Sequence, residues 1–229
     1  LDAAFLSQKN FIANASHELR TPITAISGEI EVALLQPRTT EEYVNVLRSL
    51  LEDTRNLGTL STQLLLLAQT SSANHHPNFK RTRIDEVLWE AKADVGRANK
   101  DYHNETRFDL QLNDEDLSIR CDEQLVKVVF MNLMDNGCKY SSDNTVLVTL
   151  RSGADRLLID FENKGAGLSA DDLEKVFKPF TRGSNSMNTK GYGIGLSLAT
   201  QIMKLHGGSI VLQNGTSPNA ITFTADFPR

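Results

Sequence analysis

The sequence predicts an α+β fold in two parts, a helical hairpin over residues 1–72 and a mixed domain of strands and helices over residues 73–229. Three observations predict it. Residues 1–72 are rich in leucine and poor in glycine, and their apolar residues recur at alternating three- and four-residue steps. Residues 71–77 have the composition of a linker. Beyond them, short runs of alternating apolar and polar residues are separated irregularly by helical patterns, which favours antiparallel strands over a Rossmann sheet.

The first part is expected to be two long helices joined by a short loop. Pro37 should end the first helix, and Thr40, followed by two glutamates, should cap the second. The recurring apolar positions form a seam along each helix: Phe5, Ile12, Ala15, Leu19, Ile23, Ile26, Ile30 and Ala33 in the first, and Tyr43, Leu47, Leu50, Thr54, Leu57, Ser61, Leu64 and Ala68 in the second. Four more leucines lie off this seam and need a further partner: Leu51, Leu60, Leu65 and Leu66. We therefore expect two copies of the hairpin to form a four-helix bundle.

The second part contains a mixture of shorter elements. The expected strands cover residues 79–84, 106–112, 117–121, 145–151, 156–162, 209–213 and 220–227. The expected helices cover residues 85–99, 122–140, 170–176 and 193–206. A polar segment over residues 180–191 is expected to be flexible.

Composition excludes several classes of protein. The chain has 229 residues and a formal net charge of −5, so it lacks the basic excess of a general nucleic-acid binder. No apolar run approaches the roughly 18–20 residues that span a bilayer, so contact with a membrane is expected only through a segment outside this chain. Cys121 and Cys138 are expected to be reduced, partly buried thiols, and the histidines lack the spacing of a metal site.

One histidine lies on the polar face of the first helix. At about 100° per residue, His17 falls roughly 150° from the apolar seam and should point to solvent. Taken alone, it fits an ordinary exposed side chain on a charged face. Its neighbours favour chemistry: Glu18 can accept from one ring nitrogen and leave the other as a nucleophile, and Thr21 lies one turn further on the same face. Pro22 removes a helical donor and is expected to bend the helix here.

Residues 17–22, His-Glu-Leu-Arg-Thr-Pro, resemble the H-box of the sensor histidine kinases of two-component systems. The resemblance covers nearly the whole chain. It implies a dimerisation and histidine-phosphotransfer hairpin, followed by an α/β sandwich that binds ATP, of the type shared with chaperone ATPases. In this family ATP phosphorylates the histidine, here His17, and the phosphoryl group passes to an aspartate in the receiver domain of a response regulator. The resemblance places Thr21 where a hydroxyl aligns water for dephosphorylation of that regulator.

The helix expected over residues 122–140 carries two amides on one face. Asn132 and Asn136 continue an apolar stripe at i, i+4 spacing, so they should be buried and should need partners. A structural hydrogen-bonded pair and a ligand or its metal both satisfy that need. Residues 132–141 resemble the N-box of the family, which implies that Asn136, helped by Asn132, holds Mg²⁺ against the triphosphate. Lys139 would then meet phosphate charge, and Tyr140 would lie by the sugar or base.

A turn after the strand over residues 156–162 contains two glycines, Gly165 and Gly167, that allow the backbone to approach a ligand. Residues 162–168 resemble the G1 box of the family. The sequence departs from the family at Asn163, where an aspartate usually accepts from the adenine amino group. Asparagine can accept or donate, so the selectivity for adenine is open at this position.

The last glycine-rich segment opens a helix. Gly191, Gly193 and Gly195 expose backbone donors at its N-terminus and resemble the G2 box, whereas the spacing fits neither a P-loop nor a Rossmann fingerprint. Residues 176–180 resemble the F-box, and residues 181–190 have the composition of a lid. In that lid, Arg182 and Lys190 are either contacts for the outer phosphates or solvated loop charges.

The resemblance predicts ATP-dependent autophosphorylation of His17 in a homodimer, phosphoryl transfer to a response regulator and phosphatase activity toward it, with Mg²⁺ as the cofactor. It implies the cytoplasmic part of a protein anchored in the inner membrane. Two alternatives remain from other classes. A dimeric scaffold could bind nucleotide without transfer, which only Asn163 favours. An ATP-hydrolysing clamp would need no phosphoacceptor hairpin, so residues 1–72 disfavour it.

Overall fold

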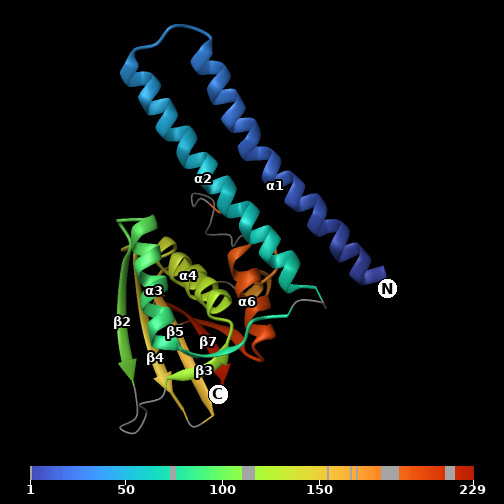
Figure 1. Ribbon diagram of the computed structural model, residues 1–229, viewed down its shortest axis with the longest axis vertical. Coiled ribbons are helices and arrows are strands. Elements are labelled where there is room, and N and C mark those ends of the chain that lie inside the picture. The colour runs from blue at the N-terminus through green and yellow to red at the C-terminus, as the bar shows by residue number, and fades with distance from the viewer. Residues whose placement is uncertain are drawn as a thin grey trace. The chain divides into compact units, whose positions relative to one another are not determined.

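The computed structural model describes residues 2–72, 76–109, 117–153, 155–165, 167–168, 170–181, 191–214 and 220–229. The chain divides into two compact units, Leu1–Ala68 and Gln69–Arg229. The first unit is helical and the second combines strands and helices (Figure 1).

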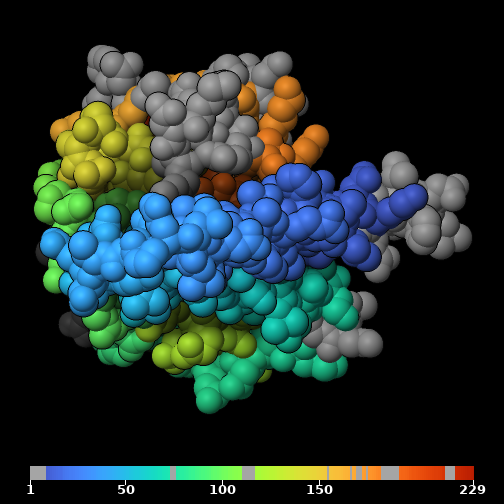
Figure 2. Space-filling model, turned by 90° about the horizontal axis from the view of Figure 1, so that it is seen from above, coloured from blue at the N-terminus to red at the C-terminus, as the bar shows by residue number. Residues whose placement is uncertain are grey.

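The first unit is a hairpin of two long helices, α1 (Asp2–Leu34) and α2 (Thr40–Thr70). Its loop end, light blue, faces the viewer in Figure 2. Helix α1 continues through Pro22, and Ser49 of α2 donates to Glu29 of α1 at 3.3 Å. The cap of α2 is Thr39, so the expectation for Thr40 is wrong. The backbone N–H of Thr39 donates to Glu42 at 2.7 Å, and the N–H of Glu42 donates back to the Thr39 hydroxyl at 3.3 Å, which forms a capping box.

The apolar seam is only partly buried within one chain. Large side chains stay exposed along it: Ile12, Ile23, Ile30, Tyr43 and Leu47. Towards the end of α2 the buried stripe runs through Leu60, Leu64 and Leu67. Leu64 belongs to the predicted 57-61-64-68 seam, whereas Leu60 is one of the leucines expected to lie off the seam and to need a further partner, and it is buried here. The exposed positions leave an apolar surface that a single hairpin does not cover.

The second unit is built on a five-stranded sheet in the order β2-β4-β5-β7-β6. Its strands are β2 (His103–Asp109), β4 (Thr145–Ser152), β5 (Arg156–Lys164), β6 (Ser209–Asn214) and β7 (Ala220–Pro228). All neighbours in this sheet are antiparallel except β2 and β4, which are parallel. A separate antiparallel pair joins β1 (Lys80–Arg83) to β3 (Ser118–Cys121). Strand β2 begins three residues before the predicted 106–112, and residues 110–112 lie outside the described part of the chain.

Helices cover one face of this sheet (Figure 1). They are α3 (Ile84–Ala98), α4 (Glu123–Lys139) and α6 (Gly195–Leu205), and a short helix α5 (Ala170–Lys175) follows β5. Helix α4 lies at the centre of the core: the ring of Phe130 is 6.0 Å from Phe161 of β5 and 6.1 Å from Phe227 of β7. A side chain at Gly137 would collide with Val146 of β4 at 2.4 Å, so glycine allows this close approach.

Both cysteines are free and fully buried in this unit. Burial raises the pKa of the Cys121 thiol and of the Cys138 thiol to about 11. They behave as small apolar side chains, because little thiolate forms at neutral pH.

A buried histidine joins three segments that are distant in the sequence. His206 follows α6, and its Nε2 accepts from the Asp122 backbone N–H at 3.0 Å, while its Nδ1 lies 2.8 Å from the Ile202 carbonyl. The Asp122 carboxylate caps α4 by accepting from Leu125 and also accepts from the backbone N–H of Asn78 at 2.8 Å. Nitrogen Nε2 acts as an acceptor, so the imidazole is held neutral.

We expect His206 to make the second unit less stable in mild acid. Burial lowers the pKa of His206, so the unfolded chain binds its proton more readily than the folded chain. The contribution of His206 to the free energy of unfolding is fully present above the ordinary histidine pKa of about 6.5. It is lost as the pH falls from there towards the lowered pKa of the folded chain. Fluorescence of Trp89, the only tryptophan, should follow this loss in urea titrations between pH 7.5 and roughly pH 5.

The matched variant is His206→Gln, which cannot titrate. Its free energy of unfolding should be lower at neutral pH but should depend less on pH, by up to about 1.4 kcal/mol per pH unit. Equal pH slopes in the two proteins would contradict the role given to His206.

Candidate functional site

His17 is exposed on α1, as its helical position predicts. Its side chain is 78% exposed, and its Nδ1 lies 3.8 Å from the Glu18 carboxylate. This separation is longer than a hydrogen bond. A small rotation of the Glu18 side chain would bring the carboxylate close enough to accept from Nδ1 and orient the ring. The Thr21 hydroxyl donates to the His17 carbonyl at 3.2 Å. Pro22 lacks an N–H for the Glu18 carbonyl, which leaves the helix backbone less satisfied beside His17.

The C-terminal half of α4 presents Asn132, Asn136 and Lys139 on one flank of the helix. This flank lies about 100° from the centre of the buried face, so the two amides are half-buried and the expectation of full burial is wrong. The Asn132 amide nitrogen donates to the Val128 carbonyl at 2.8 Å, which fixes the side chain. A Cβ at Gly195 would lie only 2.4 Å from the Asn132 oxygen, so α6 begins directly against this amide.

Lys139 connects this flank of α4 to the glycine-rich segment. Its ammonium group lies 5.9 Å from the ring centroid of Tyr140. A Cβ at Gly191 would be 2.6 Å from the same ammonium group. The fold thus brings one positive charge against the backbone that precedes α6.

Position 193 has to be a glycine. Its φ is +69°, and a Cβ there would lie 2.6 Å from the Thr181 carbonyl oxygen. Its own carbonyl accepts from the Phe180 N–H at 2.9 Å, which fixes the end of the segment over residues 176–181. Helix α6 begins at Gly195, two residues after the predicted start, because Gly193 is in a left-handed conformation. The preceding Ile194 supplies no side-chain cap, so backbone donors at this helix start can meet an anion.

Asn163 has a buried amide group that no described residue satisfies. Its side chain is on β5, between Val146 of β4 and Ile221 of β7, and the residue is 3% exposed. Its amide nitrogen has no hydrogen-bond partner among the described residues. A Cβ at Gly165 would lie 2.6 Å from the Tyr140 carbonyl and 3.2 Å from this nitrogen, so the turn closes tightly around the amide. A pocket of about 220 Å³ that includes Asn163 is lined mainly from the other face of the sheet, by residues such as Thr145, Leu147 and Glu162, so it is not the space that the buried amide faces. A buried amide with an unsatisfied nitrogen is itself typical of a group that a ligand completes.

The structure brings together most of the predicted site residues of the second unit. Asn132 meets Gly195, Lys139 meets Gly191, and Gly165 meets both Asn163 and Tyr140. Gly167 has room for a side chain, since a Cβ there would make only an ordinary contact with Asn214 at 3.5 Å. Arg182 and Lys190 lie outside the described residues. His17, Glu18 and Thr21 belong to the other unit.

Sequence reasoning missed two features of the second unit. The cluster of Asn78, Asp122 and His206 depends on contacts across 44 and 84 residues of sequence. The contact of Gly193 with Thr181 depends on the path of the chain before α6. In the described part of the chain, no group of histidine, cysteine, aspartate and glutamate is arranged to hold a metal. The same part contains no helix with the length and hydropathy to cross a membrane.

An exposed histidine on a helical hairpin, followed by a sheet unit with a glycine-lined, amide-bearing site, defines the class of histidine kinase cores. Residues 7–73 match the family model of the His Kinase A (phospho-acceptor) domain. Residues 121–229 match the model of the histidine kinase-, DNA gyrase B- and HSP90-like ATPases. The chain belongs to the sensor histidine kinases of two-component systems.

Relatives agree with this assignment. Sensor histidine kinase HprS of Escherichia coli (strain K12) is 30% identical over 208 residues, which are 87% of this chain and 43% of that protein. Sensor histidine kinase CusS of Escherichia coli O157:H7 is 28% identical over 221 residues, which are 93% of this chain and 44% of that protein. The chain thus spans less than half the length of these relatives.

Solved structures share the fold. Acinetobacter baumannii histidine kinase AdeS is 22% identical, with a TM-score of 0.72 over 93% of this chain and 97% of that one. Histidine kinase ThkA, solved in complex with response regulator protein TrrA, is 24% identical, with a TM-score of 0.71 over 96% of this chain and 61% of that one. Both confirm the predicted order of a helical hairpin followed by an α/β ATPase-type unit.

Proposed function

We propose that this chain phosphorylates itself on His17 with ATP and transfers the phosphoryl group to an aspartate of a response regulator. Residues 1–72 would be the dimerisation and phosphotransfer hairpin, and residues 73–229 the catalytic ATP-binding domain. The observation that carries the proposal is the 78% exposed imidazole of His17, on a hairpin joined to an ATPase-type unit. Its ring nitrogens are open to an incoming phosphate, and no packing role accounts for it.

The reaction is a displacement at phosphorus. The lone pair of one His17 ring nitrogen forms a bond to the γ-phosphorus, and the bond from that phosphorus to the β-γ bridging oxygen breaks, which releases ADP. Glu18, 3.8 Å from Nδ1, would hold the proton of that nitrogen and leave Nε2 as the nucleophile. The protein otherwise positions ATP and neutralises charge, as in other phosphoryl transfers.

The nucleotide would be held by the residues that converge around α4 and α6. Asn163 would meet the base, and Tyr140, Gly165 and Gly167 would border it. Lys139 and the donors at the start of α6 would meet the phosphates, with Gly191, Gly193 and Gly195 leaving room for them. Arg182 and Lys190 would approach the outer phosphates from the lid.

Magnesium fits this site through oxygen ligands. The Asn132 oxygen lies at the start of α6, and Asn136 is one turn further along the same flank of α4. Amide oxygens together with phosphate oxygens are a ligand set that Mg²⁺ accepts. When bound, the ion would neutralise phosphate charge, while Asn132 and Asn136 would fix its position.

The partners follow from exposed surfaces and from relatives. A second copy would cover the apolar side chains left exposed on the hairpin. A receiver domain would dock on the hairpin around His17, in keeping with the complex of ThkA and TrrA. A segment outside this chain would anchor the protein in the inner membrane, with these residues on the cytoplasmic side.

Incubation with γ-labelled ATP tests the proposal. Label that is stable in base and lost in acid indicates phosphohistidine and supports the kinase. Free phosphate without labelled protein indicates an ATPase, and neither product indicates a nucleotide-binding scaffold. Either of the last two outcomes would overturn the proposal.

Thr21→Ala should reduce dephosphorylation of the regulator and spare autophosphorylation. The hydroxyl shares the His17 face and donates to the exposed His17 carbonyl at 3.2 Å, so its loss should hardly disturb the helix. Release of phosphate from phosphorylated regulator should slow by roughly tenfold or more. Thr24→Ala is the matched control, because Thr24 makes the same contact to the Arg20 carbonyl at 3.0 Å. A parallel fall in kinase activity would mean that Thr21 acts through the helix beside Pro22.

Asn163→Asp should raise the affinity for ATP and sharpen discrimination against GTP. A carboxylate only accepts, and adenine offers an amino donor where guanine offers a carbonyl. The gain should be about 1–3 kcal/mol for one charge-assisted bond, offset in part by desolvation at this 3% exposed position. Competition between ATP and GTP for binding to each protein measures this preference. Asn163→Ala is the control, because alanine can neither accept from nor donate to the base. An unchanged preference would show that Asn163 recognises the base by another scheme.

A further inference from the structure

Strand β2 is an open edge of the five-stranded sheet. Within the described part of the chain, β4 is the only strand that pairs with it, and Figure 1 shows β2 at the outer border of the second unit. The His103 N–H donates to the Asn144 carbonyl at 2.9 Å, on the side of β4. Successive residues of a strand turn their backbone groups to alternate sides, so those of Asn104, Thr106 and Phe108 face the open side. A further strand can bond to these groups.

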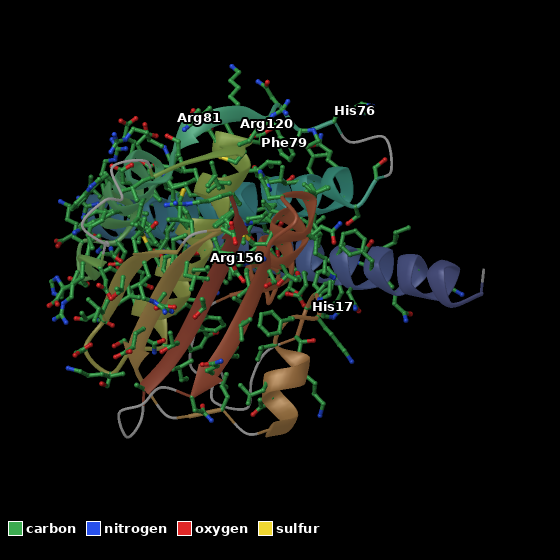
Figure 3. The ribbon with its side chains drawn as sticks, turned by 90° about the horizontal axis from the view of Figure 1, so that it is seen from below. His17, His76, Phe79, Arg81, Arg120 and Arg156 are labelled. Carbon is green, nitrogen blue, oxygen red and sulfur yellow. The ribbon has the colours of Figure 1, made fainter. Side chains whose placement is uncertain are left out.

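The outer face of the sheet, opposite α3, α4 and α6, carries opposite charges on neighbouring strands. Arg151 of β4 is 2.6 Å from Asp160 of β5. Arg156 of β5, labelled on the sheet in Figure 3, is paired with Asp226 of β7. Cross-strand charge pairs are thus a recurring feature of this face.

Glu105 and Arg107 of β2 add two more charges to this face, at its open edge. Both side chains are exposed, and no ion pair between described residues involves either of them. They lie opposite a leucine and a threonine of β4, which cannot neutralise them. Asp109, at the end of the strand, differs, because it lies directly opposite Arg151 of β4. The charges of Glu105 and Arg107 are therefore available to a strand on the open side.

The order of residues makes β2 complementary to itself. The strand reads His-Asn-Glu-Thr-Arg-Phe-Asp over residues 103–109. In an antiparallel pair of two such strands centred on Thr106, Glu105 of each copy lies opposite Arg107 of the other, and the end residues His103 and Asp109 also face each other. A centre at Glu105 would oppose two carboxylates, and a centre at Arg107 would oppose two guanidinium groups. Opposite charges stabilise a strand pair and like charges destabilise it, so charge selects the centre at Thr106.

The backbone is compatible with the same centre. Thr106 would face its own copy and Asn104 would face Phe108 as hydrogen-bonded pairs, since these residues carry the groups on the open side. Glu105 and Arg107 would then form the non-hydrogen-bonded pairs, in which opposed side chains are closest. Both the charges and the hydrogen bonds therefore agree with one register.

Protection of the edge does not account for these charges. Edge strands are commonly protected by lysine, proline or a bulge, and β2 contains neither lysine nor proline. The strand at the other edge, β6, reads Ser-Ile-Val-Leu-Gln-Asn and carries no charged side chain. Charge is thus not the general means by which this sheet protects its edges.

We propose that β2 pairs in antiparallel orientation, about Thr106, with β2 of a second copy of this chain. The two five-stranded sheets would form one continuous sheet through this contact, which is distinct from the apolar surface of the hairpin. Trp89 of α3 and Phe108 lie beside the edge, with ring centroids 6.2 Å apart, and are 47% and 41% exposed. Pairing would bring the second copy against this apolar surface.

The contact would also affect the strand on which the last turn of α4 packs. The Cys138 thiol of α4 donates to the Asn104 side-chain oxygen at 3.5 Å, and Lys139 is the next residue. A second copy on β2 would therefore hold the strand beside the end of α4 that carries the candidate phosphate contact.

Cysteine cross-linking of the full chain tests the pairing and its register. Chains that carry Glu105→Cys and Arg107→Cys are co-expressed with different tags and oxidised mildly. In the proposed register these two positions have Cα atoms about 4.5 Å apart, within the range for a disulfide, whereas each lies about 8 Å from its own copy. We expect the mixed dimer to form at least roughly fivefold faster than a dimer of either variant alone. Cys121 and Cys138 are free and fully buried, so they add little background.

Charge reversal tests the attraction. Thr106→Cys should cross-link to its own copy, because Cα atoms of a hydrogen-bonded pair are about 5.5 Å apart. In that background, Glu105→Arg or Arg107→Glu alone would oppose like charges at both positions, so the rate should fall by at least roughly tenfold. Both reversals in one chain restore opposite charges and should return the rate to within about threefold. Lys204→Glu is the matched control, because it reverses an exposed charge on α6 and should leave the rate unchanged.

Recovery in the double reversal supports the proposal, because a second charge change does not repair a damaged fold, and circular dichroism shows whether each variant is folded. Equal rates for the mixed and single cysteine variants would overturn it. Faster cross-linking by Glu105→Cys or Arg107→Cys alone would indicate another register and also overturn it, as would an unchanged rate in the single reversals or no recovery in the double reversal. None of these measurements uses ATP, so they stand whether or not the chain is a kinase.

Discussion

His17→Gln is expected to abolish autophosphorylation while nucleotide binding and dimer formation persist. Glutamine keeps a polar, neutral side chain but has no ring nitrogen with a nucleophilic lone pair. The position is 78% exposed, so the substitution removes little packing and should change the free energy of unfolding by less than about 0.5 kcal/mol. Incorporation of label from γ-labelled ATP should fall to background, and affinity for ATP should remain that of the wild-type chain.

His76→Gln is the matched control for this loss. His76 is also exposed, but it lies beyond the hairpin helices, near the start of the second unit. This variant should incorporate label at the wild-type rate. Label retained by His17→Gln would show that another residue accepts the phosphoryl group, and loss of nucleotide binding would show that His17 also has a structural role.

The order of elements could be predicted because each depends on local pattern. The heptad steps of α1 and α2 and the alternation in β4 and β5 are set by residues close in sequence. The cap of α2 was misplaced by one residue because Thr39 and Thr40 are equally suitable by type. Only the reciprocal bonds of Thr39 with Glu42 distinguish them.

The register of the hairpin and the start of α6 depend on context that a local pattern lacks. Leucines are abundant on several faces of α2, so their sequence alone does not fix which stripe, here through Leu60 and Leu64, is buried. The prediction that α6 starts at Gly193 is wrong, because Gly193 packs against Thr181 with a φ of +69°, which is not a helical conformation.

The site residues were found by motif, and their contacts were not. The spacing of Asn132 and Asn136 indicates a shared face, but their half-burial depends on which face of α4 is buried in the core. The sequence indicated that Asn163 departs from the family. It could not show that the amide would be buried with an unsatisfied nitrogen, because that depends on strands β4 and β7 on either side.

Gly193→Ala is expected to weaken ATP binding strongly. A left-handed conformation costs an alanine about 1–2 kcal/mol, and its Cβ would lie 2.6 Å from the Thr181 carbonyl and 3.0 Å from the Thr181 nitrogen. Backbone atoms cannot move aside as a flexible side chain can, so the turn before α6 must shift. This turn orients the N–H groups that lie at the start of α6. Affinity for ATP should therefore fall by roughly tenfold to thirtyfold.

Gly167→Ala distinguishes this strain from the general effect of adding a methyl group near the site. A Cβ at Gly167 would have only an ordinary contact, 3.5 Å from Asn214, so ATP affinity should change by less than about threefold. Equilibrium binding of a fluorescent ATP analogue measures both variants, and Trp89 fluorescence in urea reports their stability. If Gly193→Ala loses stability and keeps its ATP affinity, the strain acts on the fold alone, and the turn at Gly193 does not position the phosphates. If both variants lose affinity equally, bulk near the ligand is the cause, and the left-handed backbone at Gly193 has no special part in binding.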